Sequence, residues 1–212
     1  MPNHTFFIGI CGPSGSGKST VAKALEELFP NLVQRIRFDN FYKTPFGRPQ
    51  AHGYTDFEHP DNFDFENLAA VLRSLLQEGK ANIPQYDKRK DTISGHLEMT
   101  ALPITIVDGF LIYYDINVRS QIDVRTFLNG SEETLYARRK NRQKCLQDEY
   151  YWNVVVPSFE QFGNPQEQHS TIRINSNRPL EEVIADYSKL IKHITTTAIK
   201  QYVKREDFLQ VK

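Results

Sequence analysis

A stretch of glycines, serines and one lysine near the amino terminus has the composition and spacing of a phosphate-binding loop. Residues 12–19 read GPSGSGKS and fit the pattern G-x-x-x-x-G-K-[ST] at every fixed position. Glycines permit the backbone torsions that turn successive amide N–H groups inward, and the helix that follows adds partial positive charge. We therefore predict a site for nucleotide phosphates, formed by Gly12, Pro13, Ser14, Gly15, Ser16, Gly17, Lys18, Ser19 and Thr20.

Three side chains of this loop have expected roles. Lys18 reaches the β- and γ-phosphates, the Ser19 hydroxyl is a ligand for Mg²⁺, and Thr20 adds a further phosphate contact. The alternative is a glycine-rich turn that matches by chance, but an apolar strand precedes the motif and a helix follows it. ATP and Mg²⁺ are thus the predicted cofactors. GTP stays open as the donor, because the loop holds phosphates and not the base.

Two aspartates come directly after predicted strands. Asp39 follows the strand expected over residues 32–38, and Asp108 follows the strand over 104–107. In parallel sheets, ligands bind at the carboxyl ends of the strands, so both carboxylates should lie near the loop. We interpret Asp39 as the base that receives a proton from an acceptor hydroxyl, and Asp108 as the group that organises Mg²⁺. The alternatives are a turn or helix cap for Asp39 and a simple Asp-Gly turn for Asp108.

A strongly basic helix is predicted over residues 132–146. Its arginines Arg138, Arg139 and Arg142 are adjacent or three to four residues apart, so one helical turn can present two of them on one face. The planar guanidinium binds phosphate oxygens in pairs. We predict a phosphate-facing lid over about residues 132–156; the alternative is a solvated helix face.

The remaining pattern alternates strands and helices. Short apolar runs predict strands over five segments, and apolar residues at helical spacing predict helices between them. Residues 41–65, rich in aromatics, Pro, Gly and Asp, are expected to form a functional loop. The fold class is therefore α/β, a three-layer P-loop NTPase fold with a parallel central sheet, helices on both faces and a small helical lid, in one domain over 1–212. The expected strands are 6–11, 32–38, 104–107, 123–128 and 171–174; the expected helices are 18–28, 66–78, 132–146, 158 onward and 180–202.

Composition limits the partners. Lys plus Arg and Asp plus Glu number 26 each, so the zero net charge argues against nucleic acid as the main partner. No apolar stretch approaches the roughly 18 residues of a membrane span, and no signal peptide is evident. Cys11 lies in an apolar strand and is interpreted as core, and it forms no metal-binding spacing with Cys145. We expect a cytoplasmic protein with a small-molecule substrate; a homo-oligomer stays open.

Several further motifs resemble one family in the order in which they occur. FDNFYK, DFEHPDNFDF, IPQYD, VDGFLIYYD and ARRKNR lie between about Phe6 and Ile174 and resemble segments of the uridine kinase and nicotinamide riboside kinase branch of the P-loop kinases. The resemblance implies a kinase that transfers the γ-phosphate to the 5′-hydroxyl of a ribonucleoside.

The resemblance also implies roles for individual residues. Asp39 would be the base, Arg139 and Arg142 would serve the phosphates, and Glu58 would hold the ribose hydroxyls. Tyr42, Phe57 and Tyr86 would frame the sugar and the base.

The chain departs from uridine kinases at four positions. Lys88 and Asp91 replace a phenylalanine and a histidine, Glu58 replaces an aspartate, and Leu135 replaces a lid arginine. Uridine, cytidine and nicotinamide riboside therefore all stay open. Asp87 and Asp91 could attract a cationic nicotinamide ring.

Two other classes of function stay open. One is a kinase for another small metabolite, such as a sugar phosphate or pantothenate. The other is a non-catalytic nucleotide-binding module.

Overall fold

Five parallel strands form the centre of the protein. The computed structural model describes residues 5–43, 47–142 and 147–209, with side chains up to residue 197. Within these residues the strand order is β2-β7-β1-β8-β9, so the first strand lies in the middle. The bounds are β1 Phe6–Cys11, β2 Val33–Arg37, β7 Ile104–Asp108, β8 Val124–Asn129 and β9 Ile172–Asn175. All five predicted strands are confirmed, and each of their ends lies within one residue of the predicted end.

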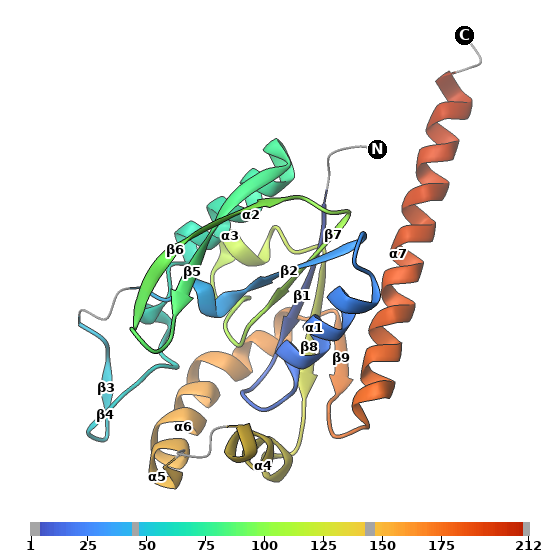
Figure 1. The fold of residues 1–212 in the computed structure, drawn as a ribbon. Helices are drawn as coiled ribbons and strands as arrows, with labels where there is room; N and C mark the ends of the chain where they lie inside the picture. Colours follow the sequence, from blue (N-terminus) through green and yellow to red (C-terminus); the bar gives the residue numbers. More distant parts are fainter. Residues whose placement is uncertain (1–4, 44–46, 143–146, 210–212) are drawn as a thin grey trace.

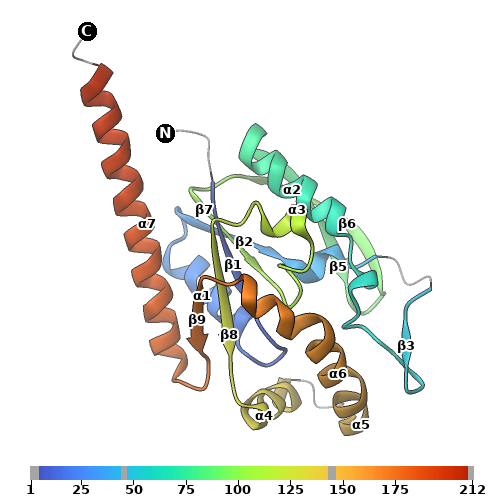
Figure 2. The same ribbon diagram turned by 180° about the vertical axis from the view of Figure 1, so that it is seen from behind.

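Helices cover both faces of this sheet. One face carries α1 (Lys18–Leu28) and α7 (Leu180–Leu209), and the other carries α2 (Phe65–Glu78) and the short α3 (Ile116–Arg119). Figures 1 and 2 show the three layers from opposite sides. The predicted P-loop fold class is thus confirmed. No helix of the described residues is long and apolar enough to cross a membrane.

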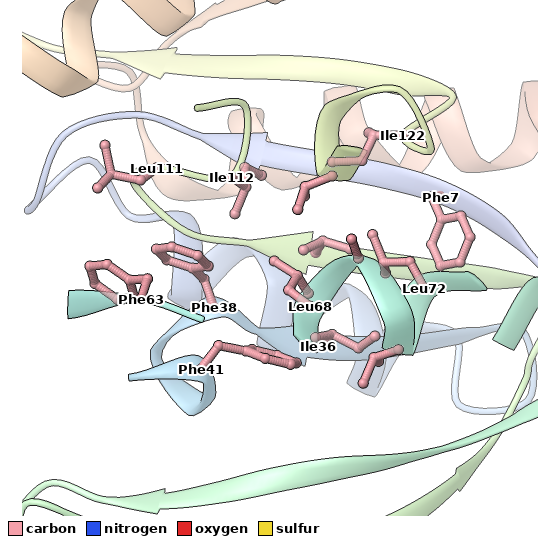
Figure 3. Packing of buried hydrophobic residues seen from close by; sticks show 14 of the residues in the cluster. Phe7, Ile36, Phe38, Phe41, Phe63, Leu68, Leu72, Leu111, Ile112 and Ile122 are labelled. Atoms are coloured by element: carbon pink, nitrogen blue, oxygen red, sulfur yellow. The ribbon is translucent and has the colours of Figure 1, made fainter. Parts of the chain in front are cut away.

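The two faces of β1 separate the core into two clusters. Ile8 and Ile10 pack toward α1 and α7, whereas Phe7 and Cys11 pack toward α2. This alternation follows from the period of two in a strand. The larger cluster, seen in Figure 3, is rich in phenylalanine. It includes Phe38 and Phe110, which follow the carboxyl ends of β2 and β7. Cys11 is fully buried there, as predicted.

An antiparallel hairpin, β5 (Lys80–Asp87) and β6 (Thr92–Thr100), lies beside the sheet and was not predicted. Most of β6 is exposed, so its sequence lacks the apolar alternation that marks a half-buried strand. The expected functional loop over 41–65 contains a second small hairpin, β3 (Gln50–Ala51) with β4 (Tyr54–Thr55).

The lid region is helical. It begins with α4 (Glu132–Arg142), and a run of helical turns over residues 148–169 includes α5 (Asp148–Tyr150) and α6 (Val156–Ser158). Residues 143–146 of the predicted basic helix, with Cys145, lie outside the described residues. In Figures 1 and 2, α4 lies below the end of β8 and α5 lies near α4, whereas the β3–β4 hairpin lies on the side of the molecule away from α7.

Gly12 brings the phosphate loop against the sheet. Its φ is +140°, and a Cβ there would lie 2.2 Å from the carbonyl oxygen of Leu128 in β8. Gly17 also has a positive φ, of +92°, but a Cβ there would meet nothing within 4 Å. The loop therefore needs glycine at 12 for space as well as for conformation.

These two glycines give a matched pair of substitutions. Gly17→Ala should lower the free energy of unfolding by roughly 1–2 kcal/mol, the ordinary cost of a left-handed residue. Gly12→Ala should cost clearly more, because the Leu128 carbonyl must also shift. Chemical denaturation of both variants checks this, and equal losses would contradict the close approach to β8.

Candidate active site

The phosphate loop connects the end of β1 to the start of α1. Gly17 precedes α1 in a left-handed conformation, and no described side chain caps the first turn of that helix. The first amide N–H groups are thus left for a ligand, and the helix dipole favours an anion there. The Lys18 ammonium donates to the carbonyl oxygens of Gly12 and Pro13, at 2.7 Å each. Burial lowers the pKa of Lys18 to about 8, partly offset by the charge of Asp108, so the amine is still mainly protonated at pH 7.

Asp108 connects this loop to the sheet. The Ser19 hydroxyl donates to Asp108 Oδ2 at 2.8 Å, and Arg35 of β2 donates to Oδ1 at 2.6 Å and to Oδ2 at 2.9 Å. The carboxylate is almost fully buried. Hydroxyl and carboxylate oxygens are the donors that Mg²⁺ prefers, so the predicted pair of Ser19 and Asp108 fits a metal beside bound phosphates. Arg35 holds both carboxylate oxygens in place.

Asp39 lies at the end of β2, as predicted, and is paired with Lys88. The Lys88 ammonium, in the turn after β5, is 2.6 Å from Asp39 Oδ2. Burial alone would raise the pKa of the Asp39 carboxyl, but Lys88, Arg37 and Lys18 outweigh it and hold that pKa below its ordinary value. Asp39 is therefore an ionised carboxylate at neutral pH, able to accept a hydrogen bond or a proton.

The three lid arginines point to different partners. Arg139 donates through both terminal nitrogens to Glu58 Oε1 at 3.0 Å, in a buried pair. Arg142 reaches the loop, with its guanidinium 3.4 Å from the Ser14 hydroxyl. Arg138 instead donates to the carbonyl oxygen of Ser176 at 2.8 Å. The structure thus brings Arg139 and Arg142 to the pocket and directs Arg138 to the connection between β9 and α7.

Aromatic residues form one wall of the pocket. Tyr42 and Tyr86 stack with ring centroids 5.0 Å apart, and the Tyr42 hydroxyl donates to the carbonyl oxygen of Phe57. Phe57 is 39% exposed, an unusual value for phenylalanine, because its ring faces the pocket. On the other side the β3–β4 hairpin meets the lid, where the Tyr54 hydroxyl donates to Glu149 at 3.1 Å.

Most of these groups border one cavity of about 970 Å³. Most of the predicted residues line it; Gly12, Pro13, Ser16 and Arg138 do not, although the first three belong to the loop itself. Each lining carboxylate has a basic partner from a different segment of the chain. The four pairs are Asp39 with Lys88, Glu58 with Arg139, Asp91 with Arg48, and Asp108 with Arg35.

The cations Lys18, Arg37 and Arg142 line the same cavity. None of the three forms an ion pair with a carboxylate of the described residues. They are the positive charge that the pocket offers to an anionic ligand.

Sequence reasoning did not single out Arg35, Arg37 or Arg48 as site residues. A weak signal existed for Arg35, since it stands between the buried residues Gln34 and Ile36 of a short strand. No comparable signal marks Arg48, which pairs with Asp91 across 43 residues.

A parallel sheet with this loop, a carboxylate at each neighbouring strand end and a basic helical lid defines a P-loop phosphotransferase, a kinase that binds a nucleotide by its phosphates. Residues 7–180 match the profile of the "Phosphoribulokinase / Uridine kinase family". The chain belongs to this family.

Individual relatives agree with this assignment. A uridine kinase of Clostridium novyi is 31% identical over 79% of this chain and 85% of its own length. A uridine kinase of Schizosaccharomyces pombe is 29% identical over 96% of this chain, which spans about half (48%) of that protein. Among solved structures, the phosphoribulokinase of Rhodobacter spheroides has a TM-score of 0.59 at 12% identity, covering 82% of this chain and 71% of its own; this shows the fold alone.

The pair between Lys88 and Asp39 predicts a pH dependence. An Asp39 whose pKa is lowered stays ionised as the pH falls. Lys88→Met should remove the main charge that lowers the pKa of Asp39, so the acidic limb of the kcat/KM profile should move to higher pH. Lys90→Met, in the same exposed turn, is the matched control and should leave the profile unchanged. An unmoved limb in Lys88→Met would contradict Asp39 as the ionising group.

The pair between Arg35 and Asp108 predicts an effect on stability. Arg35→Met leaves a buried carboxylate without its partner, which should lower the free energy of unfolding by about 3–5 kcal/mol. The double variant with Asp108→Asn should recover a large part of this loss. Arg37→Met, two residues along the same strand but exposed, should change stability by only about 0.5 kcal/mol. Denaturant titration compares the three, and equal losses for Arg35→Met and Arg37→Met would argue against the buried pair.

Proposed function

We propose that this chain transfers the γ-phosphate of ATP or GTP to the 5′-hydroxyl of a ribonucleoside. The observation that carries the proposal is that one cavity is lined both by the phosphate loop with Lys18 and by Asp39 with the aromatic wall. A donor triphosphate and an acceptor hydroxyl can meet there without leaving the pocket. The uridine kinases among the chain's relatives support the same acceptor class.

The transfer needs positioning and charge more than covalent chemistry from the protein. Lys18 and the loop amides hold the phosphates, while Arg142 approaches from the lid. Asp39 orients the acceptor hydroxyl and receives its proton as the acceptor oxygen bonds to the γ-phosphorus. The bond from that phosphorus to the bridging β-phosphate oxygen breaks, and the nucleoside diphosphate leaves. A bound Mg²⁺ would neutralise phosphate charge next to Ser19 and Asp108.

The acceptor would lie against Tyr42, Phe57 and Tyr86. Glu58 would bind ribose hydroxyls through Oε2, since both hydrogen bonds from Arg139 end on Oε1. The same pair connects the acceptor side of the pocket to the lid helix α4. Acceptor binding and lid position are therefore expected to depend on each other, which would limit hydrolysis of the triphosphate by water.

Nicotinamide riboside is the second candidate acceptor, which rests on the negative charges of Asp87 and Asp91. The contacts of these two carboxylates weaken that argument. Asp87 accepts hydrogen bonds from the backbone N–H groups of Arg89 and Lys90, so it caps a turn. Asp91 is paired with Arg48. Neither carboxylate is an unpaired negative charge facing the pocket. A non-catalytic nucleotide-binding module is the third candidate, and the presence of Lys18 and Asp39 in one cavity argues against it.

The experiment that tests the proposal is triphosphate consumption in the presence of Mg²⁺ across a panel of acceptors. The panel holds uridine, cytidine, adenosine, nicotinamide riboside, pantothenate and 2′-deoxyuridine, with Lys18→Ala as the blank. We expect consumption that depends on one or more ribonucleosides and falls with the 2′-deoxy compound. Consumption with pantothenate alone, or with no acceptor on the panel, would contradict the proposal.

Asp39→Asn separates a kinase from a binding module. The amide cannot accept the proton, so turnover should fall by about 10²–10⁴-fold. Nucleotide affinity, measured by calorimetry, should stay within about threefold, because Asp39 does not belong to the phosphate loop. Unchanged turnover would exclude Asp39 as the base.

A further inference from the structure

Arg48 lies directly behind the aromatic wall of the acceptor pocket. Its side chain is only 6% exposed, and it does not itself line the cavity. Its guanidinium carbon is 5.4 Å from the ring centroid of Tyr42 and 5.2 Å from that of Phe57. Both rings line the cavity, so a fixed positive charge contacts the two residues against which the acceptor would lie.

The charge of Arg48 is tied to Asp91. One terminal nitrogen, Nη2, donates to Asp91 Oδ1, to the Tyr86 hydroxyl and to the carbonyl oxygen of Lys43. Tyr86 also donates to Asp91 Oδ1. Asp91 lines the cavity, yet this pairing cancels the negative charge that it would otherwise present there.

Two of the three guanidinium nitrogens of Arg48 donate no hydrogen bond to the described residues. Its Nε and Nη1 atoms are buried and have no hydrogen-bond partner among the described residues. The guanidinium forms an ion pair with the carboxylate of Asp91 and lies over the rings of Tyr42 and Phe57. A cation against a ring draws on the negative potential of the π-face. Those two rings are correspondingly poorer partners for a second cation in the pocket.

We propose that Arg48 determines the charge preference of the acceptor site, so that the wall accepts a neutral ring and disfavours a cationic one. The inference rests on the proposed function, because it takes the acceptor to be a nucleoside that lies against Tyr42, Phe57 and Tyr86. Within that function it names the substrate class: nucleosides with an uncharged base, such as a pyrimidine, ahead of those with a pyridinium ring.

The test compares kcat/KM for nicotinamide riboside with kcat/KM for uridine in four proteins. Arg48→Gln removes the cation and leaves the Asp91 carboxylate unpaired, so the ratio should rise by about tenfold. Asp91→Asn leaves the arginine unpaired, so the ratio should fall below that of the unsubstituted protein. The double variant removes both charges and frees the faces of Tyr42 and Phe57, so its ratio should lie between that of Arg48→Gln and that of the unsubstituted protein.

Because the two single variants should change the ratio in opposite directions, the test distinguishes an effect of charge from misfolding. Misfolding lowers both rates and does not move the ratio upward in one variant and downward in the other. Equilibrium binding of both nucleosides, measured by calorimetry, gives the same comparison without turnover. An unchanged ratio in Arg48→Gln and Asp91→Asn, with uridine still phosphorylated by the unsubstituted protein, would overturn this inference alone. Absence of binding and of turnover with these two nucleosides and with the cytidine and adenosine of the panel would overturn the proposed function, and this inference with it.

Discussion

The constraint on which the site depends is that carboxylates must lie close to a place where polyphosphate binds. A bare carboxylate there would repel the ligand, and a buried one would be costly in the free protein. The structure meets the constraint by pairing, since each of the four carboxylates that line the pocket has a cation from another segment. The cations that remain, Lys18, Arg37 and Arg142, then give the pocket a positive surplus for phosphate.

These pairs also explain how separate elements become one site. Arg35 and Asp108 tie two neighbouring strands beneath the phosphate loop. Lys88 brings the β5–β6 hairpin to the end of β2, and Arg139 brings the lid to the acceptor side. Arg48 fixes the position of Asp91 and contacts the aromatic wall. Ion pairs therefore hold the phosphate loop, the proposed base Asp39 and the proposed acceptor wall together at one edge of the sheet.

Much of this fold could be predicted from the sequence, because buried parallel strands are short apolar runs and α1 has clear helical spacing from Lys18. The phosphate loop and the positions of Asp39 and Asp108 followed from the same local signals. The β5–β6 hairpin could not be predicted this way, because an exposed strand such as β6 carries little apolar pattern. Partners such as Arg48 and Asp91 are far apart in the chain, and only the packed structure selects which charges meet.

In the proposed reaction, one pocket transfers a phosphoryl group from a nucleotide to the 5′-oxygen of a nucleoside. The most direct measurement is phosphorus and proton NMR of the product formed from ATP, Mg²⁺ and uridine by the unsubstituted protein. We expect a monophosphate whose phosphorus couples to the two protons on the 5′-carbon. Phosphate on another oxygen, or free inorganic phosphate with unmodified uridine, would contradict it.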